Sequence, residues 1–274
     1  MKPSVLIPIA PGTNRNEELA LAFRAAGADT FEVPLQHLRA GEVKLADHQI
    51  LALPGGFSYG DALGAGRLLG LDLRGWFGEQ LQEAAARQVP IIGICNGFQA
   101  LVKAGMLPGN VDPLPNSPSR RTALASSKPV EVVATLTDNE NHRFECRWVH
   151  LSAQAGHSVW LSKLAERDKP IRCPVAHGEG RFVTSDLAAV EAAGRVAFRY
   201  CGPDGELAGG AYPMNPNGSG GDIAGVVDDS GLVLGLMPHP EDHVFERQDP
   251  HWRRGGGGRC LDLFRAGVEA VAEN

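Results

Sequence analysis

Short apolar runs alternate with amphipathic stretches over the first hundred residues of the chain. The runs are rich in aliphatic and β-branched residues, which favours buried strands, and the stretches between them carry apolar residues at helical spacing. We expect strands over residues 4–10, 29–34, 49–53 and 89–94, and helices over residues 17–26, 63–71 and 76–88. Strands separated by helices of this length predict an α/β fold, with a mostly parallel twisted sheet and helices on both faces.

The rest of the chain is less regular. We expect strands over residues 131–138, 144–151, 196–200, 223–227 and 232–237, and a closing helix over residues 261–272. Residues 110–128 are rich in proline and serine, which predicts a surface insertion, and residues 242–258 end in four glycines, which predicts a flexible loop. No stretch has the composition of a linker between domains, so we expect residues 1–274 to form a single domain.

Composition excludes several classes of function. The 26 basic and 32 acidic residues give a net charge of −6, which argues against a nucleic-acid partner. No apolar run approaches the roughly 18 residues that a membrane span needs, and the first residues lack the pattern of a signal peptide. The five cysteines form no CxxC pair, which is typical of a reducing compartment. We therefore expect a cytoplasmic protein.

One cysteine stands where the strand expected at 89–94 ends and a helix begins. Cys95 has Gly93 and Gly97 two residues away on either side, which is the G-x-nucleophile-x-G elbow with sulfur in place of oxygen. Such a turn pushes the side chain out above the sheet, and the helix N-terminus favours the reactive thiolate. Free cysteines are also common in protein cores, so a structural cysteine is the alternative. The matching context favours a nucleophile.

A second polar group follows the strand expected at 232–237. His239 stands between two prolines, and Glu241 comes two residues later. A histidine beside a carboxylate can act as the base that activates a nucleophile, while the carboxylate orients the ring. An exposed loop histidine is the alternative. His239 with Asp242 and His243 also suggests a metal site, but metal ligation has no use for Cys95, and we expect no metal.

Acyl transfer also needs donors for the oxyanion. The backbone N–H of Asn96 directly follows the expected nucleophile and is one candidate. The Gly55-Gly56-Phe57 turn, at the end of a neighbouring strand, is a candidate for the second donor, because glycine allows close backbone approach. An ordinary turn between a strand and a helix also explains these glycines, and the two explanations are compatible.

Together these segments resemble a known family. Residues 93–99 and the Pro238-His239-Pro240-Glu241 segment resemble class I, or triad-type, glutamine amidotransferases. The resemblance implies a flavodoxin-like α/β fold. Four further segments narrow it to the glutaminase subunits of phosphoribosylformylglycinamidine synthases, from purine synthesis: 54–61, 143–148, 177–182 and 215–219. The matching segments extend from residues 11–14 to the last helix, so the resemblance covers most of the chain.

The resemblance implies a role for each candidate residue. Cys95 would attack the side-chain amide of glutamine, with His239 as base and then acid, and Glu241 orienting the ring. Gly56 and Asn96 would hold the oxyanion. The expected substrate-binding residues are Gly55, Phe57, Gln99, His177 and Glu179.

The resemblance also implies partners. Ammonia would pass to a separate synthetase subunit, which binds ATP and Mg²⁺ and converts formylglycinamide ribonucleotide to formylglycinamidine ribonucleotide; a small third subunit is left open. This chain has no G-x-x-x-x-G-K-[ST] motif and is expected to hold no cofactor. Two alternatives are a stand-alone cysteine hydrolase of γ-glutamyl substrates and a non-catalytic regulatory subunit.

Overall fold

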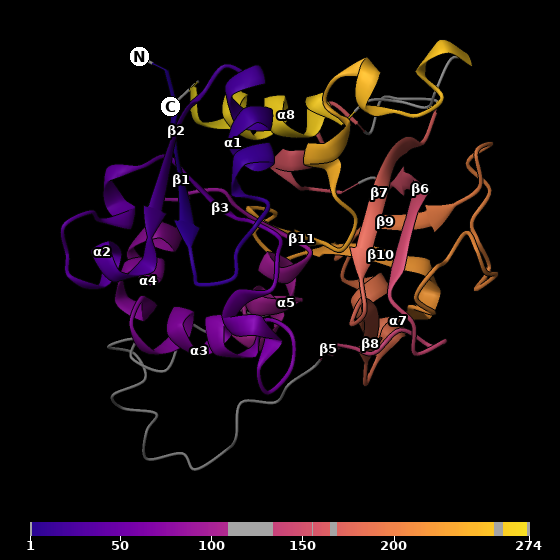
Figure 1. The fold of residues 1–274 in the computed structure, drawn as a ribbon, viewed down its shortest axis with the longest axis horizontal. Helices are drawn as coiled ribbons and strands as arrows, with labels where there is room; N and C mark the ends of the chain where they lie inside the picture. Colours follow the sequence, from indigo (N-terminus) through magenta and orange to yellow (C-terminus); the bar gives the residue numbers. More distant parts are fainter. Residues whose placement is uncertain (1, 109–133, 155, 165–168, 255–259, 273–274) are drawn as a thin grey trace.

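The computed structural model of the chain describes residues 2–108, 134–154, 156–164, 169–254 and 260–272. Within these ranges one sheet of nine strands dominates the molecule, and a small second sheet pairs β5 (Ala134–Thr137) with β8 (Arg181–Thr184) (Figure 1). The strands of the main sheet lie in the order β2 (Asp29–Pro34), β1 (Ser4–Ile9), β3 (Ile50–Leu53), β4 (Ile91–Ile94), β11 (Val233–Leu236), β10 (Ile223–Val227), β9 (Val196–Cys201), β6 (Glu145–Ala153) and β7 (Ile171–His177).

The half of the sheet from β2 to β11 is parallel, and its central strands β3 and β4 are buried along their whole length. Helices α1 (Asn16–Ala25) and α8 (Leu261–Ala272) pack together over this half. Helices α3 (Arg67–Gly75), α4 (Gly78–Ala86) and α5 (Asn96–Lys103) cover the opposite face (Figure 1). The predicted α/β fold, with helices on both faces, is therefore confirmed.

The half of the sheet from β11 to β7 is antiparallel. Only β10 and β6 run against the other strands of the sheet, so most strands still share one direction. Strand β7 was not predicted from the sequence, because Pro174 interrupts its apolar run. The proline is tolerated because β7 is an edge strand, where one side of the backbone needs no ladder partner. Strand β8 and the short helices α2 (Leu35–Arg39) and α7 (Leu187–Ala192) were also missed.

The helix predicted over residues 63–71 is wrong at its start. Helix α3 begins at Arg67, and the residues before it have backbone conformations that no right-handed helix allows: φ is +65° at Leu63, +109° at Gly64 and +69° at Gly66. The apolar spacing was read correctly from residue 67 onward. These residues pack closely against α5, where a Cβ at Gly66 would lie 2.6 Å from the backbone nitrogen of Ala100, and the N–H of Ala65 donates to Glu179. The local pattern shows neither contact.

The two segments predicted as loops are described unequally. The insertion predicted at residues 110–128 lies outside the described residues, as do residues 255–258 of the loop predicted at 242–258. The described part of the predicted 242–258 loop, together with the two residues before it, forms three short 3₁₀ turns, at Pro240–His243, Glu246–Gln248 and Trp252–Arg254. The buried side chains of His243, Val244 and Asp249 attach it to the body of the protein. None of the described helices combines the length and the apolar character that crossing a membrane requires.

Candidate active site

Cys95 occupies a strained turn at the centre of the sheet. It directly follows β4 and precedes α5, with φ +50° and ψ −106°. The flanking glycines are sterically required: a Cβ at Gly97 would lie 2.2 Å from the Leu53 carbonyl oxygen, and one at Gly93 would lie 2.7 Å from the carbonyl oxygen of Gly97. A non-glycine residue with positive φ is uncommon and marks stored strain, often at functional sites. The strand–turn–helix context that the elbow motif needs is therefore present.

His239 and Glu241 form a buried pair at the end of β11. The Nδ1 atom of His239 lies 2.7 Å from Oε1 of Glu241, and both side chains are almost completely buried. The backbone N–H of His239 donates to the carbonyl of Pro174 on β7 at 2.8 Å, which fixes the residue from the antiparallel half of the sheet. The carboxylate thus determines which ring nitrogen carries the proton, as an orienting group must.

The side chains of His239 and Cys95 both lie beside Gly55. A Cβ at this glycine would lie 2.8 Å from Cε1 of His239 and 3.5 Å from Cβ of Cys95, so both side chains line the same small gap. The other ring nitrogen of His239, Nε2, is buried and has no hydrogen-bond partner among the described residues. Burial opposes a charge on the ring, but the adjacent Glu241 and Cys95 raise the pKa of His239 well above its usual value.

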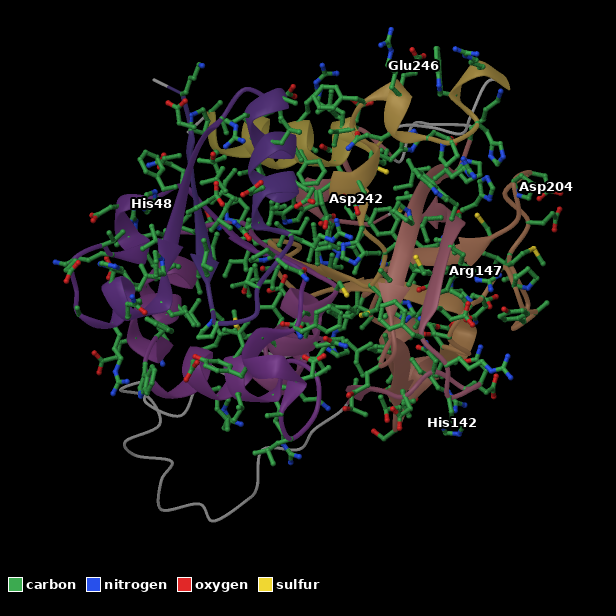
Figure 2. All side chains as sticks on the ribbon, viewed as in Figure 1. His48, His142, Arg147, Asp204, Asp242 and Glu246 are labelled. Atoms are coloured by element: carbon green, nitrogen blue, oxygen red, sulfur yellow. The ribbon has the colours of Figure 1, made fainter. Side chains whose placement is uncertain are left out.

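A second carboxyl group borders this pair. Asp242 lies near the middle of the molecule, where the segment after β11 contacts both α1 and β7 (Figure 2). Burial and the neighbouring Glu241 raise the pKa of Asp242 to about 6. The guanidinium of Arg15, 3.8 Å from Oδ2 of Asp242, partly offsets this accumulation of negative charge.

His239, Glu241 and Asp242 are also the candidate metal ligands among the described residues, with ligand atoms within 4.8 Å of one another. However, Nδ1 of His239 is already hydrogen-bonded to Glu241, so a metal at this nitrogen would displace the contact that orients the ring. The absence of a metal stays a prediction.

The predicted oxyanion donors lie at two adjacent turns. Asn96 begins α5, so its N–H has no acceptor within the helix. Gly56 has φ +135°, and a Cβ there would lie 2.7 Å from the backbone nitrogen of Asn14. The N–H of Phe57 instead donates to Gly12 at 3.0 Å and is not free for an oxyanion. Gly56, rather than Phe57, is thus the donor that the predicted turn can offer.

Gln99 and Glu179 belong to one hydrogen-bond network beside Cys95. The buried side chain of Gln99 accepts from the Asn96 amide at 3.0 Å and donates to the backbone carbonyl of Glu179 at 2.6 Å. The carboxylate of Glu179 accepts from the N–H of Ala65 at 3.2 Å. The network joins the first turn of α5 to the loop of residues 177–182.

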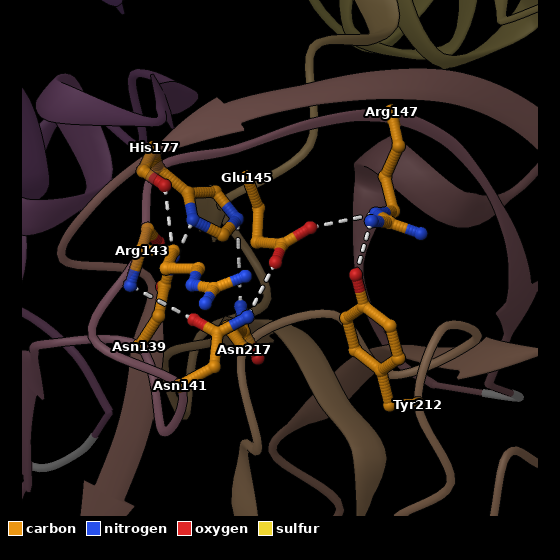
Figure 3. Close-up of polar contacts among 8 residues, drawn as sticks. All are labelled: Asn139, Asn141, Arg143, Glu145, Arg147, His177, Tyr212 and Asn217. Atoms are coloured by element: carbon orange, nitrogen blue, oxygen red, sulfur yellow. Dashed lines mark hydrogen bonds and ion pairs between the residues drawn. The ribbon is translucent and has the colours of Figure 1, made fainter.

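His177 is held by two asparagines that the sequence did not single out as site residues (Figure 3). Its Nδ1 lies 3.1 Å from Oδ1 of Asn139, and its Nε2 lies 3.5 Å from the amide nitrogen of Asn217. Burial and the nearby His239 lower the pKa of His177 to about 3, so the ring is neutral. With Nδ1 donating and Nε2 accepting, both ring nitrogens are occupied by the protein itself. The loop around residue 217 was noted in the sequence, and Asn139 carried no signal.

Comparison with known proteins identifies the family of this chain. The family model of the CobB/CobQ-like glutamine amidotransferase domain matches residues 2–271. The phosphoribosylformylglycinamidine synthase subunit PurQ of Treponema denticola is 43% identical over 278 residues, which cover 99% of this chain and 100% of the relative. The same subunit of Dehalococcoides mccartyi is 40% identical, over 98% of this chain and 97% of the relative.

Solved structures agree as well. A chain in the structure of PurLQS from Thermotoga maritima superposes with a TM-score of 0.71 and 30% identity, covering 99% of this chain and 100% of that chain. A glutamine amidotransferase from Thermotoga maritima, at 15% identity and a TM-score of 0.54, shares the fold. The family model, the relatives and the shared fold identify the chain as a class I glutamine amidotransferase. Within this class, the chain belongs to the PurQ family, the glutaminase subunits of phosphoribosylformylglycinamidine synthase.

Proposed function

We propose that this chain hydrolyses glutamine to glutamate and ammonia through a triad of Cys95, His239 and Glu241. The observation that carries the proposal is the convergence at Gly55, where the elbow cysteine and the ring of His239 meet, with Glu241 hydrogen-bonded to the far side of that ring. A nucleophile, a base and an orienting carboxylate in this order are the parts that acyl transfer needs.

The reaction then follows from the positions of these groups. His239 takes the proton of the Cys95 thiol, and the thiolate attacks the side-chain amide carbon of glutamine. The N–H groups of Gly56 and Asn96 stabilise the negative oxygen of the tetrahedral intermediate. His239 returns the proton to the leaving nitrogen, and ammonia departs. A water molecule, deprotonated by His239, hydrolyses the glutamyl thioester and releases glutamate and the free thiol.

The predicted substrate-binding residues enter this proposal in different ways. Gly55 and the exposed Phe57 flank the oxyanion turn, while Gln99 and Glu179 form the network beside the first turn of α5. His177 has no free ring nitrogen, so we propose that it supports its loop rather than contacting glutamine directly.

We further propose that the ammonia is used by a synthetase subunit, which converts formylglycinamide ribonucleotide to formylglycinamidine ribonucleotide in the cytoplasm. The match to a chain in a PurLQS structure supports a multisubunit assembly. ATP and Mg²⁺ would bind to that partner, and no cofactor is proposed for this chain. Ammonia is mostly protonated at neutral pH and then not nucleophilic, which is a physical reason for direct transfer between subunits.

Covalent labelling tests the triad. The wild type and Cys95→Ser are incubated with the glutamine analogue 6-diazo-5-oxo-norleucine, with the synthetase subunit present, and intact masses are measured. One adduct on the wild type and none on the variant is the expected result. An unmodified wild-type chain would leave the glutamine-directed nucleophile without support.

A further inference from the structure

Three non-glycine residues between Ser58 and Gly66 adopt left-handed backbone conformations. The angle φ is +56° at Tyr59, +53° at Asp61 and +65° at Leu63. Residues with side chains rarely adopt such conformations, which persist where surrounding contacts enforce them. Because this segment directly follows the Gly55-Gly56-Phe57 turn, whatever enforces its conformation also bears on the position of the Gly56 N–H.

The side chain of Asn96 supplies that contact from the first turn of α5. Its Oδ1 accepts from the backbone N–H of Ser58 at 3.1 Å, and its Nδ2 donates to Oδ1 of Asp61 at 3.2 Å. We call these two bonds the Asn96 clamp. Asn96 is 2% exposed, so water does not compete for its amide. The clamp bonds to both ends of the Ser58–Asp61 turn and so connects the strained segment to α5, the helix that follows Cys95.

The opposite side of the oxyanion turn is already fixed by backbone bonds. Phe57 donates to Gly12 at 3.0 Å, and Tyr59 donates to Pro11 at 2.6 Å. Gly56 thus lies between the segment bonded to residues 11 and 12 and the Asn96 clamp. A shift of the clamped segment would move the Gly56 N–H relative to the N–H of Asn96, although Asp61 touches neither of these groups.

We propose that Asp61 is a positioning residue: its carboxylate oxygen, held by the Asn96 side chain, keeps the strained 58–66 segment and the Gly56 N–H in place for the oxyanion. This inference rests on the proposed glutaminase reaction and assigns a role that the triad does not include. The proposed role of Asp61 is to offer an acceptor at a fixed position rather than a charge, because the charge that acts on its carboxyl group is the like charge of Glu179.

Three substitutions separate the acceptor from the charge and from backbone strain. Asp61→Asn keeps an Oδ1 acceptor for the Asn96 amide and removes the charge. Asp61→Gly removes the acceptor but suits a φ of +53°, and Asp61→Ala removes the acceptor in a conformation unfavourable for alanine. Glutamate release by the complex with the synthetase subunit is measured for each variant, and kcat and KM are determined separately.

The proposal predicts that Asp61→Asn retains at least about half of the wild-type kcat. Asp61→Gly and Asp61→Ala lose about tenfold or more in kcat, with KM changed less than about threefold, because a misplaced oxyanion donor acts on the transition state. Asn96→Ala leaves its backbone N–H in place but also removes the bonds to Ser58 and Gln99, so it loses at least as large a factor. The double variant with Asp61→Ala loses little more than Asn96→Ala alone, because the bond between the two side chains is already broken in Asn96→Ala.

Several results would overturn the proposal. A raised KM with unchanged kcat in Asp61→Ala would mean that the carboxylate binds the substrate instead. Equal losses in Asp61→Asn and Asp61→Ala would assign the effect to charge, and full activity in Asp61→Gly would assign it to strain. Cys95→Ser serves as the control for the reaction itself. If Cys95→Ser releases glutamate as fast as the wild type, the proposed function is wrong. If Cys95→Ser is inactive and Asp61→Ala is fully active, only the positioning role of Asp61 is wrong.

Discussion

Replacing Gly55 by alanine tests the contact between the two reacting side chains. The added Cβ would lie 2.8 Å from Cε1 of His239, whereas carbon atoms normally approach to about 3.5 Å or more. The imidazole must therefore move by about 0.7 Å or more, away from Gly55. The two other contacts, 3.4 Å to Cγ of Arg15 and 3.5 Å to Cβ of Cys95, are close to normal, so the histidine rather than the cysteine has to yield.

The expected loss follows from this displacement. Misplacing a reacting group by about 1 Å costs on the order of 100-fold in rate, so a displacement of this size predicts a loss between about 10-fold and 100-fold in kcat/KM. This equals about 1.4 to 2.7 kcal/mol of transition-state stabilisation. The buried Glu241 limits the freedom of the ring, because moving His239 also stretches the 2.7 Å bond between them.

The assay compares Gly55→Ala with a matched substitution elsewhere. At Gly75, at the end of α3, an added Cβ would meet no described atom within 4 Å apart from its chain neighbours and the backbone of its own helix. Gly75→Ala is therefore expected to leave glutamate release unchanged. Thermal unfolding is measured for both variants to establish that they fold. Activity of Gly55→Ala within about threefold of the wild type would refute the argument, since His239 would then not be packed against this glycine.

Two further predictions concern charge. Glu241→Gln is expected to lower kcat by about 100-fold to 10,000-fold, because the carboxylate orients the ring of His239. It is also expected to lower the pKa of His239, measured by NMR, because the carboxylate favours the charged ring. An unchanged kcat would contradict the orienting role. Burial and the charge of Glu179 raise the pKa of Asp61 from 3.8 to about 6, so the folded state binds this proton more tightly than the unfolded state and stability falls as the pH rises from 4 to 6. Asp61→Asn removes this penalty, which is about 1 kcal/mol for a half-exposed group. The Tm of Asp61→Asn minus that of the wild type is therefore expected to be larger at pH 8 than at pH 4. A Tm difference that does not change with pH would contradict this prediction.

The parts of the fold and site that were predictable are local in sequence. The parallel half of the sheet follows from alternating apolar runs and helical stretches. Cys95 could be singled out because the glycines that its turn requires stand two residues away on either side. His239 and Glu241 are only two residues apart, so a chain segment of four residues shows the orienting pair.

The parts that were missed depend on contacts between distant segments. Pro174 argues against a strand in any local analysis, and only the edge position of β7 explains why it is allowed. The backbone of residues 58–66 is set by Asn96 and Glu179, which lie 38 and 114 positions away from their partners Ser58 and Ala65. The support of His177 by Asn139, 38 residues earlier, is likewise a long-range contact.

The most direct test of the account is product formation by the reconstituted complex with two nitrogen sources. A complex of the synthetase subunit with the wild-type chain, or with Cys95→Ser, is supplied with either glutamine or ammonium, and formylglycinamidine ribonucleotide is quantified. Cys95→Ser is expected to abolish product formation from glutamine and to leave the reaction with ammonium unchanged. Product from glutamine at the wild-type rate in Cys95→Ser would contradict the central claim that Cys95 releases the ammonia.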